Sequence, residues 1–285
     1  MNLPKIASPT YIFREEAPEK LPEILPRLAE IGFDGVELCT LFGWDVAEVE
    51  RMLAETGLAL AGDNWPVYDL MEHPEEVVEW HRRLGSFSLT PGGFRDEHLP
   101  GGEYFAEAKE WFARLGKLCR EAGIRLLYHN HFKEMRKLPD GTSVLDALMA
   151  AVPETDLSMQ PDLGWMQIGG GDPLYYLRKY AGRIPMVHFK DFYASDMAKI
   201  GDPFDLEGRR GGPERGHFEF RPTGYGISGI AVQVPHVLAC RPAWVVTCQD
   251  TVYGRSKYDD LADGLIALKK NLSLYAQAEE ERAEQ

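Results

Sequence analysis

The sequence predicts an α/β fold, and within that class a single (β/α)8 TIM barrel. Short apolar segments alternate along the chain with longer segments of helical periodicity, a pattern typical of a parallel sheet covered by helices. Eight such apolar segments occur in 285 residues, which suits a barrel that closes on itself. Because no linker-like stretch interrupts the alternation, we expect one domain over residues 1–285.

The expected strands are short and apolar, and several end in polar residues. They lie near Lys5 and at residues 34–39, 58–63, 86–91, 124–131, 156–162, 184–191 and 243–250. The main alternative to a barrel is an open, doubly wound sheet. Its nucleotide-binding version needs a glycine-rich phosphate loop after the first strand, and the sequence after Lys5 does not contain one.

Helical periodicity appears between most of these strands. It covers residues 20–32, 45–57, 103–123, 143–152, 172–182 and 261–277. In the first of these segments, Leu21, Ile24 and Leu28 fall on one face of a helix. Asp172 followed by Pro173 is a favourable helix start, because the aspartate can cap the helix and proline fits its first turn.

One connection is unusually long. Residues 191–226 are rich in Gly, Pro, Arg and Asp and follow the seventh expected strand. Loops of this length are usually functional or disordered, and this one leaves the face of the barrel where active sites form. We therefore expect a lid over the active site, with a passive insertion as the alternative. Residues 278–285 are predicted to form a solvated, charged C-terminal tail.

Composition and charge restrict the class of function. The chain has a formal net charge of -14, with 44% hydrophobic and 27% charged residues, and this negative charge argues against nucleic-acid and anionic-membrane partners. No apolar run approaches the length of a membrane span, and residues 1–16 lack the pattern of a signal peptide. The four cysteines show no CxxC spacing, so we expect a cytoplasmic protein.

Polar residues gather at the carboxyl ends of the expected strands, where barrel enzymes place their active sites. Side chains two residues apart in a strand share a face, so four pairs are expected to point together into the barrel mouth. These pairs are His129 and His131, Gln160 and Asp162, His188 and Lys190, and Cys248 and Asp250. Three imidazoles and a carboxylate are a suitable donor set for a divalent transition ion such as Zn, Mn or Co.

Each of these residues also has a purely structural interpretation. A strand-end histidine is more often a hydrogen-bonded structural residue than a ligand, and the coincidence of three histidines with Asp162 is what favours a site. Lys190 can simply form an ion pair with Asp191, and Glu134 can cap a loop or pair with a neighbouring base. Trp165 suits packing in the core as well as stacking on a sugar ring.

Five segments, in order and at barrel spacing, are similar to the xylose-isomerase-like superfamily of sugar isomerases and epimerases. They are IGFDGVEL (31–38), YHNHFKE (128–134), PDLGWMQIGGGDP (161–173), GRIPMVHFKD (182–191) and, more loosely, WVVTCQD (244–250). The HNH motif at 129–131 resembles one branch of this superfamily. The resemblance implies a TIM barrel, and known members include keto-sugar epimerases, inosose isomerases and dehydratases, hydroxypyruvate isomerases and dehydroshikimate dehydratases.

The resemblance also implies a ligand set for one divalent ion, with Mn, Co and Zn as the alternatives. Asp162 and His188 match the Asp and His of the family, whereas His129 and Cys248 stand where relatives usually have glutamates. In the epimerases those two glutamates act as acid and base on opposite faces of the substrate. Their absence favours an isomerase or a dehydratase over an epimerase, and it makes Glu134 a candidate for the missing carboxylate.

We therefore predict a divalent-metal-dependent isomerase, epimerase or dehydratase that acts on a keto-sugar, an inosose or a related hydroxy-ketone through an enediolate-type intermediate. The assigned residues are Glu134, Lys190, Glu37 and His131 for catalysis, His129, Asp162, His188 and Cys248 for the metal, and Asn64, Trp165 and Asp250 for substrate binding. The alternative is a non-catalytic sugar-binding or regulatory barrel that has lost its acid/base residues. Homo-oligomerisation stays open, as does a carboxylated or phosphorylated substrate, because the long loop is rich in arginine.

Overall fold

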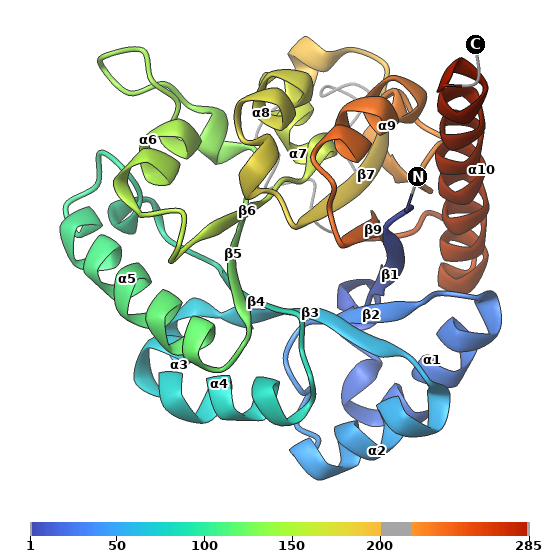
Figure 1. Ribbon diagram of the computed structural model, residues 1–285, viewed down its shortest axis with the longest axis horizontal. Coiled ribbons are helices and arrows are strands. Elements are labelled where there is room, and N and C mark those ends of the chain that lie inside the picture. The colour runs from blue at the N-terminus through green and yellow to red at the C-terminus, as the bar shows by residue number, and fades with distance from the viewer. Residues whose placement is uncertain (1, 201–217, 284–285) are drawn as a thin grey trace.

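The strands form a ring with the helices outside it (Figure 1). The computed structural model describes residues 2–200 and 218–283. Its barrel strands are β1 (Lys5–Pro9), β2 (Gly35–Leu38), β3 (Ala59–Pro66), β4 (Ser88–Gly92), β5 (Arg125–His129), β6 (Ser158–Gln160), β7 (Met186–Ala194) and β9 (Trp244–Cys248). They pair in parallel in the order β6-β5-β4-β3-β2-β1-β9-β7. A bridge between Asp162, just past the end of β6, and His188 in β7 closes the ring. The predicted (β/α)8 barrel is therefore confirmed.

Helices follow the strands and cover the outside of the barrel. They are α1 (Ala17–Ile31), α2 (Val46–Thr56), α3 (Val67–Glu72), α4 (Pro74–Arg83), α5 (Phe105–Glu121), α6 (Val144–Ala151), α7 (Leu163–Ile168), α8 (Pro173–Lys179), α9 (Ile230–Ala239) and α10 (Lys257–Ala283). All six helices expected from periodicity are present. The sequence pattern does not predict α3, α4, α7 or α9, because α3 and α7 have six residues each, α4 is dominated by charge and α9 contains Pro235.

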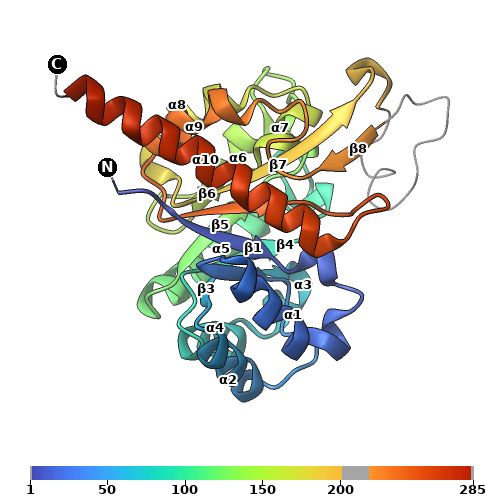
Figure 2. The same cartoon turned by 90° about the vertical axis from the view of Figure 1, so that its right-hand side faces the viewer.

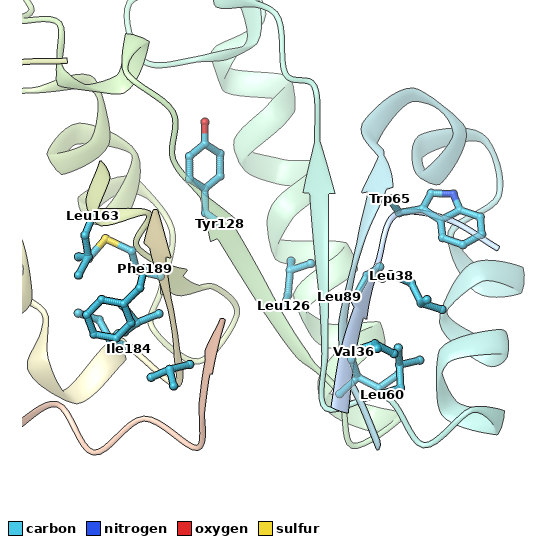
Figure 3. Close-up of a cluster of buried hydrophobic side chains, with 14 of the residues drawn as sticks. Val36, Leu38, Leu60, Trp65, Leu89, Leu126, Tyr128, Leu163, Ile184 and Phe189 are labelled. Atoms are coloured by element: carbon cyan, nitrogen blue, oxygen red, sulfur yellow. The ribbon is translucent and has the colours of Figure 1, made fainter. Parts of the chain in front are cut away.

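Side-chain alternation along the strands divides the interior into two layers. Residues such as Val36, Leu126 and Phe189 point outward and pack under the helices, as Figure 3 shows for part of this layer. A smaller cluster, which includes Leu127 and Val246, fills the space inside the barrel. The next inward positions along β5, β7 and β9 carry polar groups, so the same two-residue period that builds the core also delivers the site.

The long connection after β7 begins as a hairpin and not as a loop. β7 continues to Ala194, past the expected strand end at residue 191, and pairs antiparallel with β8 (Phe218–Arg221). The buried carboxylate of Asp191 accepts hydrogen bonds from the backbone amides of Gly224, Gly226 and Ser228, which fixes the return of the chain. Residues 201–217 lie outside the described residues, so the lid stays a prediction.

The C-terminal helix α10 runs along the outside of the barrel (Figure 2). It continues through Ala283, so residues 278–283 of the predicted charged tail are helical, and most of their charged side chains are exposed. Across residues 2–200 and 218–283, no helix is both long and apolar enough to cross a membrane.

Candidate active site

A cavity of about 630 Å³ opens at the carboxyl ends of the barrel strands. It brings together residues from β2, β3, β5, β7 and β9 and from the loops that follow them. Ten of the side chains assigned from sequence line it: Glu37, Asn64, His129, His131, Glu134, Trp165, His188, Lys190, Cys248 and Asp250. The eleventh, Asp162, is fully buried beside them. The expected convergence of residues from separate strands on one mouth is therefore present in the structure.

Three candidate metal ligands lie close enough together to share one ion. The donor atoms of His129, Asp162 and His188 all fall within 4.8 Å of one another. His129 ends β5, Asp162 caps the start of α7 by accepting the amide of Trp165 at 2.8 Å, and His188 lies in β7. Asn130 holds the Asp162 backbone by accepting its amide at 3.0 Å, so the HNH motif contributes a positioning amide between its two histidines.

The unpartnered atoms in this cluster show that it fits a cation. Nδ1 of His129, Oδ2 of Asp162 and Nδ1 of His188 are buried and have no hydrogen-bond partner. Leaving such groups unpaired in a protein interior is costly, and imidazole nitrogens and a carboxylate oxygen are good ligands for divalent transition ions. The residues present therefore match the donor set that such an ion requires.

A carboxylate behind His188 fixes the orientation of its ring. Glu37 approaches Nε2 of His188 at 3.0 Å, and Gln160 donates to the same carboxylate at 2.6 Å. Burial would lower the pKa of His188, but Glu37 and Cys248 raise it well above its usual value. A carboxylate on the far nitrogen of a metal-binding histidine sets the tautomer of the ring and increases its basicity, so Glu37, which also lines the cavity, is placed to support His188.

A second cluster surrounds the ammonium group of Lys190. It contacts Oδ1 of Asp250 and donates to Sγ of Cys248 at 3.3 Å, and it lies 3.6 Å from Oδ2 of Asp162. Burial would lower the pKa of Lys190, but Asp250, Cys248 and Asp162 raise it well above its usual value. The side chain therefore stays charged. Its ion-pair partner is Asp250, not Asp191 as the structural alternative supposed, because adjacent residues in β7 point to opposite faces.

The pKa values of His129, His131 and Asp162 are shifted mainly by burial. Burial and the neighbouring His188 lower the pKa of His129 well below its usual value. The pKa of His131 is also lowered, by burial first. Burial raises the pKa of Asp162 to about 6 even though Lys190 opposes the shift. Two neutral imidazoles thus face the cavity near physiological pH, which is the form that accepts protons.

Both carboxylate oxygens of Glu134 accept hydrogen bonds from nearby groups of the protein. Oε1 accepts the hydroxyl of Tyr128 at 2.8 Å and Oε2 accepts the amide of His131 at 2.9 Å. The side chain is 1% exposed. A carboxylate with two such partners is better suited to holding the His131 loop in place than to carrying a proton, so its assignment as the missing acid is not favoured by this geometry.

Two residues that the sequence pattern does not single out, Phe220 and Arg14, contact Lys190 and Asp250. Phe220 on β8 and Trp165 lie around the Lys190 ammonium, with ring centroids 5.2 and 5.3 Å away. Arg14 donates to the backbone carbonyl of Asp250 at 2.9 Å. The position of Phe220 depends on the hairpin, and that of Arg14 on a contact between opposite ends of the chain, so strand patterns give no signal for either.

Comparison with known proteins places this site in context. The family model described as a xylose isomerase-like TIM barrel matches residues 25–231. An inosose dehydratase from Clostridium beijerinckii is 27% identical over 199 residues, which cover 62% of this chain and 65% of that protein. An inosose dehydratase from Clostridium perfringens strain 13 is 31% identical over 227 residues, or 70% of this chain and 75% of the other.

A solved structure shows the same fold over nearly the whole chain. It is that of a probable 3-DHS dehydratase, AsbF, from Bacillus anthracis, with a TM-score of 0.72 at 16% identity. The likeness covers 93% of this chain and 98% of the other. At this identity it supports the barrel architecture alone.

Proposed function

Because the chain belongs to the xylose isomerase-like TIM barrel family, we propose that it is a metal-dependent enzyme that removes water from a keto-polyol of the inosose type. The observation that carries this proposal is the position of His131, whose ring centroid lies 5.1 Å from that of His129, beside the cluster of His129, Asp162 and His188. Burial lowers the pKa of His131, which favours its neutral form. Two curated relatives act as inosose dehydratases, and a dehydration requires only one proton carrier. An epimerisation of the two-base kind requires a second, opposed acid/base group.

His129, Asp162 and His188 would hold the divalent ion. When bound, the ion would supply Lewis-acid stabilisation of the negative charge that develops on the substrate's carbonyl oxygen. Glu37 supports His188 in this arrangement. The ammonium of Lys190 is held by Asp250 at the edge of the same cavity and offers a hydrogen-bond donor to a substrate hydroxyl or carbonyl.

His131 would move the proton. Its ring lies at the cavity wall with its centroid 5.1 Å from that of His129 and 5.7 Å from Trp165. It would remove the proton from the carbon next to the carbonyl and then return it to the hydroxyl that leaves from the adjacent carbon. The C–H and C–O bonds break, a C=C bond forms, and water carries away the proton and the hydroxyl, so the step needs no other reactant.

The test combines product detection with isotope exchange. Purified protein is incubated with inososes and keto-sugars in deuterated water, and the formation of an unsaturated ketone is followed by its ultraviolet absorption. The His131→Gln variant is expected to lose both dehydration and exchange, by roughly 10²–10⁴-fold, while it keeps its bound metal. A protein that neither dehydrates nor exchanges any of these compounds would contradict the proposal and favour a sugar-binding barrel.

A further inference from the structure

A second cavity lies at the opposite end of the barrel from the candidate active site. It has a volume of about 730 Å³ and is lined by the segment that leads into β1 and by the turn between α9 and β9. β1 and β9 run parallel, with Lys5 paired to Trp244 at their amino ends, whereas the active-site cavity opens at the carboxyl ends. The two cavities share no lining residue, so a molecule bound here would not occupy the active site.

The charge of this second cavity is opposite to that of the chain as a whole. Two bases, Lys5 and Arg241, line it together with the side-chain amide of Asn2, and no described acidic residue does. Among residues 2–200 and 218–283, neither base forms an ion pair with an acidic side chain. The chain has a formal net charge of -14, so two unpaired bases in one hollow create a local site of attraction for an anion.

Arg241 has a backbone conformation that usually belongs to glycine. It follows the C-cap of α9, and its φ of 52° lies in the left-handed region. Its amide donates to the carbonyl of Leu238 at 3.0 Å. Helices often end in this way with glycine, and a residue with a Cβ is less stable in this conformation. An arginine here therefore costs stability, as residues with a functional role often do.

The wall beside the two bases is apolar and held in place. The Lys5 ammonium lies 5.4 Å from the ring centroid of Trp244, which is a cation–π contact. The Trp244 side chain packs so closely on Gly35 that a Cβ at Gly35 would lie 2.9 Å from its Cη2 atom. Leu3 and Leu238 add apolar surface to the same cavity. Bases beside an apolar wall suit a ligand that has both a negative group and an apolar part.

We propose that this cavity binds a small organic anion, a carboxylate or a phosphate ester that carries an apolar portion. The anionic group would lie between Lys5 and Arg241, and the apolar portion would pack against Leu3 and Leu238. The site is separate from the proposed dehydration, because it uses none of the residues assigned to that reaction, so either proposal can fail without the other.

Calorimetric titration of the full-length protein with benzoate and with phenyl phosphate tests this site and distinguishes the two kinds of anion. The native protein is expected to bind one equivalent of at least one of these probes. Arg241→Gly and Lys5→Gln should each weaken that binding by roughly tenfold or more, because each removes a charged hydrogen-bond donor. Arg241→Gly should melt at a temperature at least as high as the native protein, since glycine relieves the left-handed backbone, so its weaker binding would not result from unfolding.

An arginine outside the cavity provides the matched control. Arg51 lies on α2 with its side chain 65% exposed, and Arg51→Ala should leave the affinity for the probes unchanged. An equal loss of affinity in Arg51→Ala would show that general charge attraction, and not this cavity, binds the anion. Native affinity in both Arg241→Gly and Lys5→Gln would place the bound probe elsewhere, and failure of the native protein to bind either probe would also overturn the proposal.

Discussion

Two buried histidine–carboxylate pairs in this barrel look alike in isolation and differ in their surroundings. His188 and Glu37 lie 3.0 Å apart, and His81 and Asp63 lie 3.4 Å apart, with all four side chains at most 2% exposed. His188 faces the cavity, and its ring centroid is 4.7 Å from that of His129.

His81 belongs to the packing between α4 and the sheet. Its Nδ1 is 2.6 Å from the carbonyl of Val77, one helical turn earlier, and its ring lies edge-on to Trp65. A buried His–carboxylate pair therefore does not by itself mark an active site. The His188 pair differs in that His129 and Asp162, which could bind the same ion, lie beside its ring, and in that the ring faces a cavity.

The largest difference between the pairs is expected from removal of each histidine. His188→Ala should lose the metal and reduce turnover by roughly 10²–10⁴-fold, which corresponds to the several kcal/mol of transition-state stabilisation that a bound metal provides. His81→Ala should leave the rate per folded molecule unchanged. Initial rates and metal content measured on both variants test this. If His188→Ala kept its full metal content and its full rate, the proposed functional difference between the His188 and His81 pairs would be wrong.

A smaller difference is expected from the carboxylates. Glu37→Gln preserves the shape of the side chain but removes the charge behind His188, so metal affinity should fall by roughly 10–100-fold. Asp63→Asn is the matched variant and should not change metal affinity. Competition with a chromophoric chelator gives both dissociation constants. Equal affinities for the two variants would mean that Glu37 does not support the ligand.

The His81–Asp63 pair is expected to contribute to the stability of the fold and not to activity. His81→Leu removes the imidazole that lies 3.4 Å from a buried carboxylate oxygen of Asp63 and the contact of its Nδ1 with the Val77 carbonyl, which is expected to cost about 1–3 kcal/mol. Urea denaturation followed by circular dichroism gives the free energy of unfolding. The proposed structural role of His81 would be wrong if this variant unfolded at the native urea concentration but lost its activity while folded.

The smallest effect on stability is expected at Asp146, whose carboxylate is more accessible than those of the two pairs and serves as a reference for them. Asp146 accepts hydrogen bonds from Lys179 and Tyr180. Burial would raise its pKa, but these bonds lower it below the usual value. Its contribution to stability is therefore present above the unfolded pKa of about 3.9 and is lost as the pH falls through the lower folded value.

The Asp146→Asn variant should accordingly lose about 0.5–1 kcal/mol at pH 7, in the range of partly exposed ion pairs. The deficit should shrink as the pH is lowered past the folded pKa, because the native carboxylate is then protonated too. Urea denaturation of the native protein and the Asp146→Asn variant at a series of pH values measures this difference in the free energy of unfolding. A deficit that is independent of pH would show that charge at Asp146 does not stabilise the fold.

Much of the fold could be predicted because strand and helix periods are local properties of the sequence. The two-residue alternation that puts Leu127 and His129 on one face of β5 operates over a few residues, so it specified both the core and the inward polar positions. The hairpin formed by β7 and β8 was not predictable in this way. It depends on Asp191, whose carboxylate accepts amides more than 30 residues later in the chain.

The strand and helix pattern predicted a closed barrel over an open sheet, and it predicted that histidine, aspartate, lysine and cysteine side chains meet at the barrel mouth. Their pairing partners became defined only in the folded barrel. It paired Glu37 with His188 across 151 residues and Lys190 with Asp250 across 60, and it engaged both oxygens of Glu134 locally. The physical reason is that hydrogen bonds and charge interactions depend on distances in space, and these exist only after the strands have closed into a ring.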